Sequence, residues 1–264
     1  MNATRDIPFR KTPQRDLFVN VYRPVGTNGP LPAILWICGG GWIGMNRAGA
    51  EKLACWMLDR GYVIVSADYR LSDEAIHPAQ IADVQAAIRW MRAHAEEFEI
   101  DPERIGIWGD SAGGHLAALA ATAGDDRTFE PDGPYPEQSQ ALQAACPIYP
   151  PVDLTDWPEG IESIREVTGL LGGTPADRPD VATDASPVTY ISSRTPPHLL
   201  IHGDQDKIVP IEQSERMLRA LQEAGVEAEL IRLPGVGHCS EAVYTEPDVR
   251  AAIIRFFDRH LKRA

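Results

Sequence analysis

Short apolar runs alternate along the chain with longer segments in which apolar side chains recur every three or four positions. The short runs are typical of buried strands, and the longer spacing is typical of helices with one face on a core. The predicted strands span residues 17–24, 33–38, 61–70, 104–108, 141–150, 197–206 and 227–233. The predicted helices span residues 48–61, 78–98, 112–124, 212–225 and 248–263.

This alternation of strands and helices predicts an α/β fold, with a mostly parallel sheet and helices on both of its faces. A chain of 264 residues can bury a large core, and α/β folds of this length commonly form one domain. We therefore expect a single domain over residues 1–264. Residues 151–197 interrupt the alternation with Pro, Gly, Asp and Thr and one short helical patch, which is typical of a functional cap-like insertion.

The composition narrows the classes of partner. A formal net charge of −13 and a pI near 4.9 argue against nucleic acid or an anionic membrane, because like charges repel. No apolar run approaches the roughly 20 residues that span a bilayer, and the N-terminal residues lack the apolar core of a secretion signal. The expected location is cytoplasmic, or secreted if a signal peptide has been removed. The four cysteines show no C-x-x-C spacing, so we expect free thiols and no metal site.

A glycine cluster follows the predicted strand 33–38. Gly39, Gly41 and Gly44 spell G-x-G-x-x-G, and Asp68 ends another predicted strand, where a ribose-binding carboxylate of a dinucleotide site could lie. Clustered glycines show only that backbone approaches something closely. A dinucleotide, an oxyanion or a neighbouring strand would each satisfy the pattern, so other residues have to decide among them.

Residues 109–113 read G-D-S-A-G and lie between the predicted strand 104–108 and the small-residue helix 112–124. That context fits a nucleophile elbow, a turn so tight that side chains in place of its glycines would strike the adjacent strand and helix. The elbow would expose the Ser111 hydroxyl at the helix N-terminus and direct the Ala112 N–H at the same space. Ser111 is therefore the predicted nucleophile.

A serine nucleophile needs a base, and the base must be oriented by a third group. Asp206 lies at the end of the predicted run 197–206, and His238 lies in a glycine-rich loop after the following strand, which gives the order Ser, Asp, His. Asp204 competes with Asp206, but Asp206 is favoured by its place before K-I-V-P, and Asp204 is expected to bond local backbone N–H groups. The other histidines lie in helices, beside a buried strand or before a proline, where structural roles are expected.

Several stretches together resemble the carboxylesterases of the α/β-hydrolase fold, close to the acetyl or feruloyl esterase-like and the hormone-sensitive-lipase-related groups. They are C-G-G-G-W at 38–42, D-Y-R-L and the P-A and D that follow it in 68–90, G-D-S-A-G-G at 109–114, H-G-D-Q-D-K-I-V-P at 202–210 and G-V-G-H at 235–238. The resemblance implies the α/β-hydrolase fold with a small cap. It also implies that Ser111, Asp206 and His238 form a catalytic triad.

The same resemblance makes the glycine cluster an oxyanion loop, in which backbone N–H groups face a carbonyl oxygen as it becomes anionic. Gly40 and Gly41, together with Ala112, are the predicted donors. The dinucleotide interpretation then loses its support, because it leaves the triad unexplained. Residues 68–70 become expected supports of the loop.

Two departures from the family pattern bear on the pocket. Cys38 stands where relatives usually have histidine, and we expect it to be a buried apolar filler, not a nucleophile or a disulfide partner. Only about 16 residues precede the first predicted strand, so we expect the helical N-terminal cap of the hormone-sensitive-lipase-like enzymes to be missing. Trp42 and residues 151–197 are therefore expected to shape the substrate pocket.

The predicted function is a serine carboxylesterase for short-chain acyl esters, with acetylated or feruloylated carbohydrate among its candidate substrates. The partner would be a small-molecule ester, no cofactor or metal is implied, and a homo-oligomer stays open. An amidase or formamidase would use the same residues. A non-catalytic receptor or interaction module on the same fold is the alternative from another class, and Cys38 is the feature that favours it.

Overall fold

The computed structural model describes residues 1–44, 46–125, 128–158, 160–161 and 163–262. The strands are β1 (Asn2–Lys11), β2 (Asp16–Arg23), β3 (Leu31–Ile37), β4 (Val63–Ala67), β5 (Ile100–Asp110), β6 (Ala144–Ile148), β7 (His198–Gly203) and β8 (Ala228–Leu233). The α-helices are α1 (Ala50–Leu53), α2 (Ala79–Ala93), α3 (Ala112–Ala123), α4 (Ile164–Leu171), α5 (Pro179–Asp184), α6 (Ile211–Glu223), α7 (Ala242–Thr245) and α8 (Pro247–Leu261). The 3₁₀ segments are η1 (Arg47–Gly49), η2 (Cys55–Arg60) and η3 (Pro187–Tyr190).

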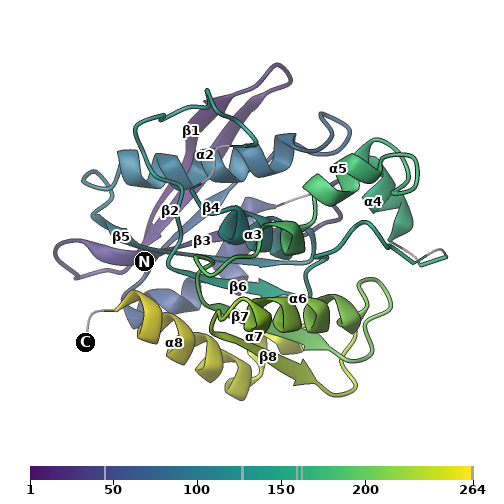
Figure 1. The fold of residues 1–264 in the computed structure, drawn as a ribbon. Coiled ribbons are helices and arrows are strands. Elements are labelled where there is room, and N and C mark those ends of the chain that lie inside the picture. Colours follow the sequence, from purple (N-terminus) through teal and green to yellow (C-terminus); the bar gives the residue numbers. More distant parts are fainter. Residues whose placement is uncertain (45, 126–127, 159, 162, 263–264) are drawn as a thin grey trace.

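The strands form one sheet, which has eight strands in the described parts of the chain, in the order β1-β2-β4-β3-β5-β6-β7-β8. Neighbours pair in parallel from β4 to β8, whereas β1 and β2 extend one edge in antiparallel pairing. Helices α2 and α3 pack on one face and α8 packs on the other (Figure 1). The predicted α/β architecture, a mostly parallel sheet covered on both faces, is confirmed.

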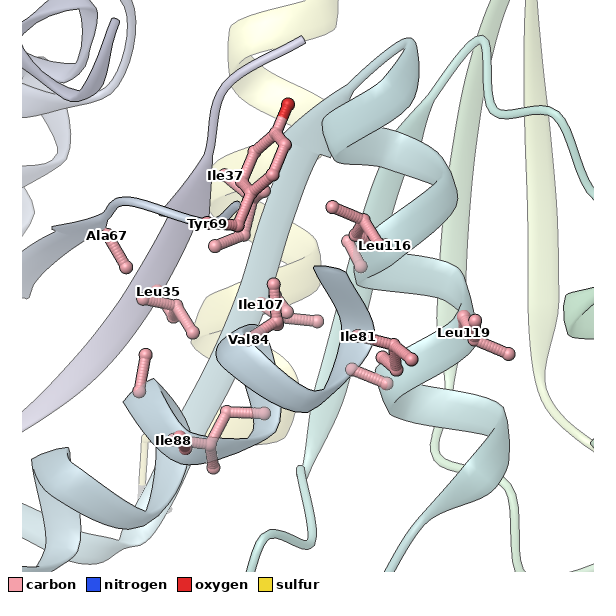
Figure 2. Close-up of a cluster of buried hydrophobic side chains, with 14 of the residues drawn as sticks. Leu35, Ile37, Ala67, Tyr69, Ile81, Val84, Ile88, Ile107, Leu116 and Leu119 are labelled. Atoms are coloured by element: carbon pink, nitrogen blue, oxygen red, sulfur yellow. The ribbon is translucent and has the colours of Figure 1, made fainter. Parts of the chain in front are cut away.

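The core lies on both faces of the central strands, because successive side chains of a strand point to opposite faces. In β3, Leu35 packs towards α2 and α3, while its neighbour Trp36 packs on the side of α8. Figure 2 shows Leu35 and Ile107 beneath Val84 of α2 and Leu116 of α3. Continuous apolar runs in the central strands are therefore explained by burial on two sides.

The first strand was not predicted. Residues Asn2–Lys11 form β1, which pairs with β2, so the first strand begins near the N-terminus and not at residue 17. Only Phe9 in β1 is buried, and the pairing with β2 contains two register shifts. An edge strand with a mostly exposed polar face shows little of the alternation that sequence patterns detect.

One predicted helix also differs from the structure. The predicted helix 48–61 is a short α1 followed by the 3₁₀ segment η2, which ends at Gly61 in the left-handed conformation. Its apolar positions still face the core, because Met57 and Leu58 are buried. The predicted helix 248–263 matches α8, although residue 263 lies outside the described residues.

The insertion 151–197 contains α4, α5 and η3, of which only the patch at α4 was predicted. Helices α4 and α5 appear at the upper right of Figure 1. Val167 and Leu170 of α4 join the core cluster on the α3 side of the sheet. None of the helices in the described parts of the chain combines the length and the apolar composition needed to cross a bilayer.

Candidate active site

Ser111 occupies a tight turn between β5 and α3. Its backbone has φ 51° and ψ −121°, a sparsely populated conformation that surrounding structure must impose. The close approach explains the glycine two residues later, because a Cβ at Gly113 would lie 2.1 Å from the carbonyl oxygen of Ile37. Ser111 remains 9% exposed at the floor of a cavity. The turn has the shape of the predicted nucleophile elbow.

His238 and Asp206 complete a hydrogen-bonded series with Ser111. In the neutral ring, His238 Nδ1–H donates to Asp206 Oδ2 at 2.6 Å, and Ser111 Oγ–H donates to His238 Nε2 at 3.0 Å. Asp206 follows β7 and His238 follows β8, which are parallel neighbours, so both loops leave the same edge of the sheet. The structure thus brings together three side chains that are up to 127 positions apart.

Asp206, and not Asp204, is the aspartate at His238. Asp206 Oδ1 accepts hydrogen bonds from the backbone N–H groups of Ile208 and Val209, each at 2.9 Å, which leaves Oδ2 for the histidine. Asp204 Oδ1 instead accepts from the Gly235 N–H at 2.8 Å, a backbone donor 31 positions away, whereas the sequence predicted bonds to local N–H groups. The K-I-V-P stretch therefore orients Asp206 through its own backbone.

Burial and hydrogen bonding act in opposite directions on this pair. Burial favours the neutral form of Asp206, but the side chains of His202 and His238 outweigh it and hold the pKa of this carboxyl well below its usual range. Burial alone would lower the pKa of His238, but the Asp206 carboxylate and the adjacent Cys239 outweigh it and raise this pKa to about 9. The pair therefore favours a carboxylate beside an imidazolium.

The glycine loop after β3 lies next to Ser111. Gly40 has φ +122°, and its carbonyl accepts hydrogen bonds from the N–H groups of Ile43 and Gly44, which closes a tight turn. Among the described residues, the N–H groups of Gly40 and Gly41 have no hydrogen-bond acceptor. Ala112 is the first residue of α3, so its N–H has no carbonyl one turn earlier in the helix. Gly40, Gly41 and Ala112 thus offer the predicted donors.

Two side chains hold the glycine loop. Asp110 Oδ1 accepts from the Gly39 N–H at 3.1 Å, and the Tyr69 hydroxyl donates to the Cys38 carbonyl at 2.9 Å. Of residues 68–70, only Tyr69 bonds the loop backbone. Asp68 is paired with Arg15 and Arg47, so it is not available to a ribose.

Trp42 and Cys38 each differ in part from expectation. Trp42 lines the cavity, but its side chain is only 2% exposed, because its Nε1–H donates to His115 Nδ1 and its ring packs edge-on against that imidazole. Cys38 is half-buried, not fully buried, because it lies at the end of β3 where the sheet opens to the loop. It is a free thiol, and burial raises its pKa to about 11.

A cavity of about 380 Å³ opens over Ser111 and His238. The glycine loop and Trp42 form one wall, and the insertion supplies much of the rest: Pro151, Trp157, Ser163, Glu166 and Val167. Ile208 and Val209, which follow Asp206, close the remaining side. Among the described residues, no three His, Cys, Asp or Glu side chains gather as a metal site would require.

Two residues of the site escaped sequence reasoning. His202, in the buried strand β7, lies with Nε2 3.3 Å from Asp206 Oδ2 and hydrogen-bonds Val209 and Ser214. Its position four residues before Asp206 was the available signal. Glu166 reaches the cavity from α4, and no pattern in the sequence marked it, because only the folding of the insertion brings it there.

A family model named BD-FAE matches residues 19–221, which is well over half of the chain. The chain belongs to the BD-FAE family. As an example of a relative, it is 33% identical to esterase LipQ of Mycobacterium tuberculosis over 92% of this chain and 58% of LipQ. The chain spans less than two thirds of the length of the curated relatives it matches first.

Solved structures show the same fold. A truncated carbohydrate esterase from gut microbiota superposes with a TM-score of 0.91 at 29% identity and covers 100% of this chain and 97% of its own. Esterase 2 of Thermogutta terrifontis with bound propionate has a TM-score of 0.79 at 27% identity and covers 99% and 96%. The same esterase has also been solved with butyrate and after phosphonylation by sarin. The predicted α/β-hydrolase fold is confirmed.

Proposed function

We propose that this chain is a serine carboxylesterase with Ser111 as nucleophile, His238 as general base and acid, and Asp206 as the group that orients His238. The observation that carries the proposal is the hydrogen-bonded series of these three side chains at the floor of a cavity. The esterase names of the relatives and structural neighbours support it. The prediction of an amidase would use the same residues, and no observation in the structure favours it.

In this mechanism Ser111 Oγ attacks the ester carbonyl while His238 Nε2 takes its proton. His238 then returns that proton to the leaving alcohol, which leaves an acyl group on Ser111. Water activated by His238 releases the acid and restores the serine. Asp206 stabilises the imidazolium that forms in each half of the reaction and keeps Nδ1 protonated.

The oxyanion of each tetrahedral intermediate would be bound by backbone N–H groups of Gly40, Gly41 and Ala112. These groups are preorganised, because the Gly40 turn and the Asp110 and Tyr69 contacts hold the loop before substrate arrives. Donors that are already aligned need no reorganisation as negative charge develops. Because these N–H groups lie beside Ser111, the glycine loop is better explained as an oxyanion site for acyl transfer than as a dinucleotide-binding loop.

The proposed substrates are short-chain acyl esters, with acetylated carbohydrate as the favoured class. The cavity is small, and apolar side chains of Trp157, Val167 and Ile208 narrow it. A structural neighbour is a carbohydrate esterase, and another binds propionate and butyrate.

We expect p-nitrophenyl acetate and butyrate to be hydrolysed with a kcat/KM at least about tenfold higher than the decanoate, because Trp42 and Trp157 line the cavity with Ser111 and a structural neighbour binds propionate and butyrate. The measurement is kcat/KM for the acetate-to-decanoate series with one purified sample, and p-nitroacetanilide in the same assay tests the amidase alternative. A decanoate ester that is turned over fastest would contradict the short-chain proposal. Anilide hydrolysis that equals ester hydrolysis would contradict the esterase proposal.

We expect kcat/KM to rise with pH as His238 loses its proton, and the pKa of His238 is raised to about 9. The base must be neutral to accept the Ser111 proton, so a raised pKa moves the active range towards alkaline pH and activity falls as pH drops. The measurement is a pH profile of kcat/KM, corrected for spontaneous hydrolysis. The Asp206→Asn variant should titrate at lower pH, and a wild-type midpoint at or below the ordinary value of 6.5 would contradict the prediction.

A further inference from the structure

Glu166 is the only carboxylate among the described residues that line the cavity over Ser111. It lies on α4, in the insertion, and packs directly on the glycine loop: a Cβ added to Gly41 would lie 2.7 Å from Glu166 Cγ. Its carboxylate therefore stands beside one of the proposed oxyanion donors. Much of the surrounding wall is apolar and includes Trp157 and Val167.

One oxygen of this carboxylate lacks a partner. Glu166 Oε2 is buried and has no hydrogen-bond donor among the described residues. The hydroxyl of Ser163, which lines the same cavity, is committed elsewhere, because Ser163 Oγ–H donates to the Ile208 carbonyl at 2.6 Å. Native proteins satisfy nearly all buried polar atoms, so this acceptor needs a donor, and in a ligand cavity the ligand can supply it.

We propose that Glu166 Oε2 accepts a hydrogen bond from a hydroxyl group of the substrate and thereby selects esters of polyhydroxylated alcohols, such as sugars. This inference rests on the proposed esterase function and assigns to that site the residue that recognises the alcohol part of the substrate. A negative charge beside Gly41 opposes the developing oxyanion, so its presence is explained by binding and not by the chemical step.

A hydroxyl fits this oxygen better than a cationic group does. The second carboxylate oxygen, Glu166 Oε1, is accessible to water, unlike the buried Oε2, so water can screen the charge of the carboxylate. What the buried oxygen lacks is one donor, and a neutral O–H supplies a donor without the cost of desolvating an ammonium group.

The experiment compares two acetates with the same three-carbon alcohol skeleton, 1-acetylglycerol and n-propyl acetate. The quantity measured is the ratio of their kcat/KM values in the wild type and in Glu166→Leu and Glu166→Gln. We expect the preference for the glycerol ester to fall about tenfold or more in Glu166→Leu, which removes the acceptor, and about threefold in Glu166→Gln, which keeps a neutral one. The loss should appear mainly in KM, because the hydrogen bond forms in ground and transition states alike.

Asp180→Asn is the matched control, because it removes one exposed negative charge from α5 of the same insertion, away from the cavity. It should keep the wild-type ratio. Circular dichroism shows whether each variant folds. If Glu166→Leu fails to fold, the kcat/KM ratio of Glu166→Gln still tests the inference, because glutamine has nearly the same volume as glutamate.

An unchanged ratio in both Glu166 variants overturns the inference while the proposed function stands, because both esters are still hydrolysed. A loss confined to acetylcholine, used as a third substrate, would assign the site to a cation and also overturn it. If the wild type hydrolyses none of these esters, the proposed function fails together with the inference.

Discussion

Replacement of Ser111 by alanine is expected to lower kcat for p-nitrophenyl acetate by about 10⁶-fold, the scale seen when the nucleophile of such a triad is lost. The elbow directs this hydroxyl at His238 Nε2, 3.0 Å away, whereas the Ser163 hydroxyl in the same cavity donates to the Ile208 carbonyl. Alanine removes one buried oxygen and keeps the backbone that the turn imposes, so the melting temperature should change little.

A covalent label tests the same residue independently. An organophosphonate should modify the wild type once per chain, at Ser111, and should not modify Ser111→Ala, as read by peptide mass spectrometry. Phosphonylation of a structural neighbour by sarin makes this reagent class a suitable probe. Ser163→Ala is the matched control, because this serine lines the same cavity and should lose neither labelling nor most of its turnover. An alanine variant at 111 with most of its turnover would refute the proposed mechanism.

Asp206→Asn is expected to lower kcat by about 10⁴-fold. The asparagine amide can donate to His238 Nδ1, which places the ring proton on Nε2, where it faces Ser111 and cannot accept its proton. The hydrogen bonds from the Ile208 and Val209 N–H groups can persist to the amide oxygen, so the loss would reflect the tautomer and not a collapsed turn.

Asp204→Asn is the control for that prediction, because it lies in the same turn but bonds the Gly235 N–H. It should lower the melting temperature slightly and change kcat by less than about tenfold, as surface substitutions away from the chemistry do. The opposite ranking of the two kcat values would transfer the orienting role to Asp204. Steady-state kinetics and thermal unfolding on both variants decide between them.

Much of the fold could be predicted from the sequence, because a buried parallel strand requires an apolar run and a helix on its face requires the three-to-four spacing. Elements that lack a strong pattern escaped. Strand β1 has one buried side chain, Phe9. It is held in the sheet by its pairing with β2, and no pattern within residues 2–11 predicts that pairing. Helix α5 spans only Pro179–Asp184 and buries only Ala182. A helix this short with one buried residue shows no three-to-four spacing of apolar positions in the sequence.

For the site, the sequence by itself determined the elbow around Ser111, since a close approach such as that of Gly113 to Ile37 is a local steric demand that glycine alone meets. The sequence also favoured Asp206 over Asp204 as a member of the triad, because Asp206 precedes K-I-V-P, and His238 over the other histidines, because His238 lies in a glycine-rich loop after a predicted strand. Only the tertiary structure decided that Asp206 and not Asp204 reaches His238, that His202 joins them, and that Glu166 enters the cavity. The reason is physical: these contacts join segments far apart in the chain or depend on side-chain direction, which packing sets and residue order does not.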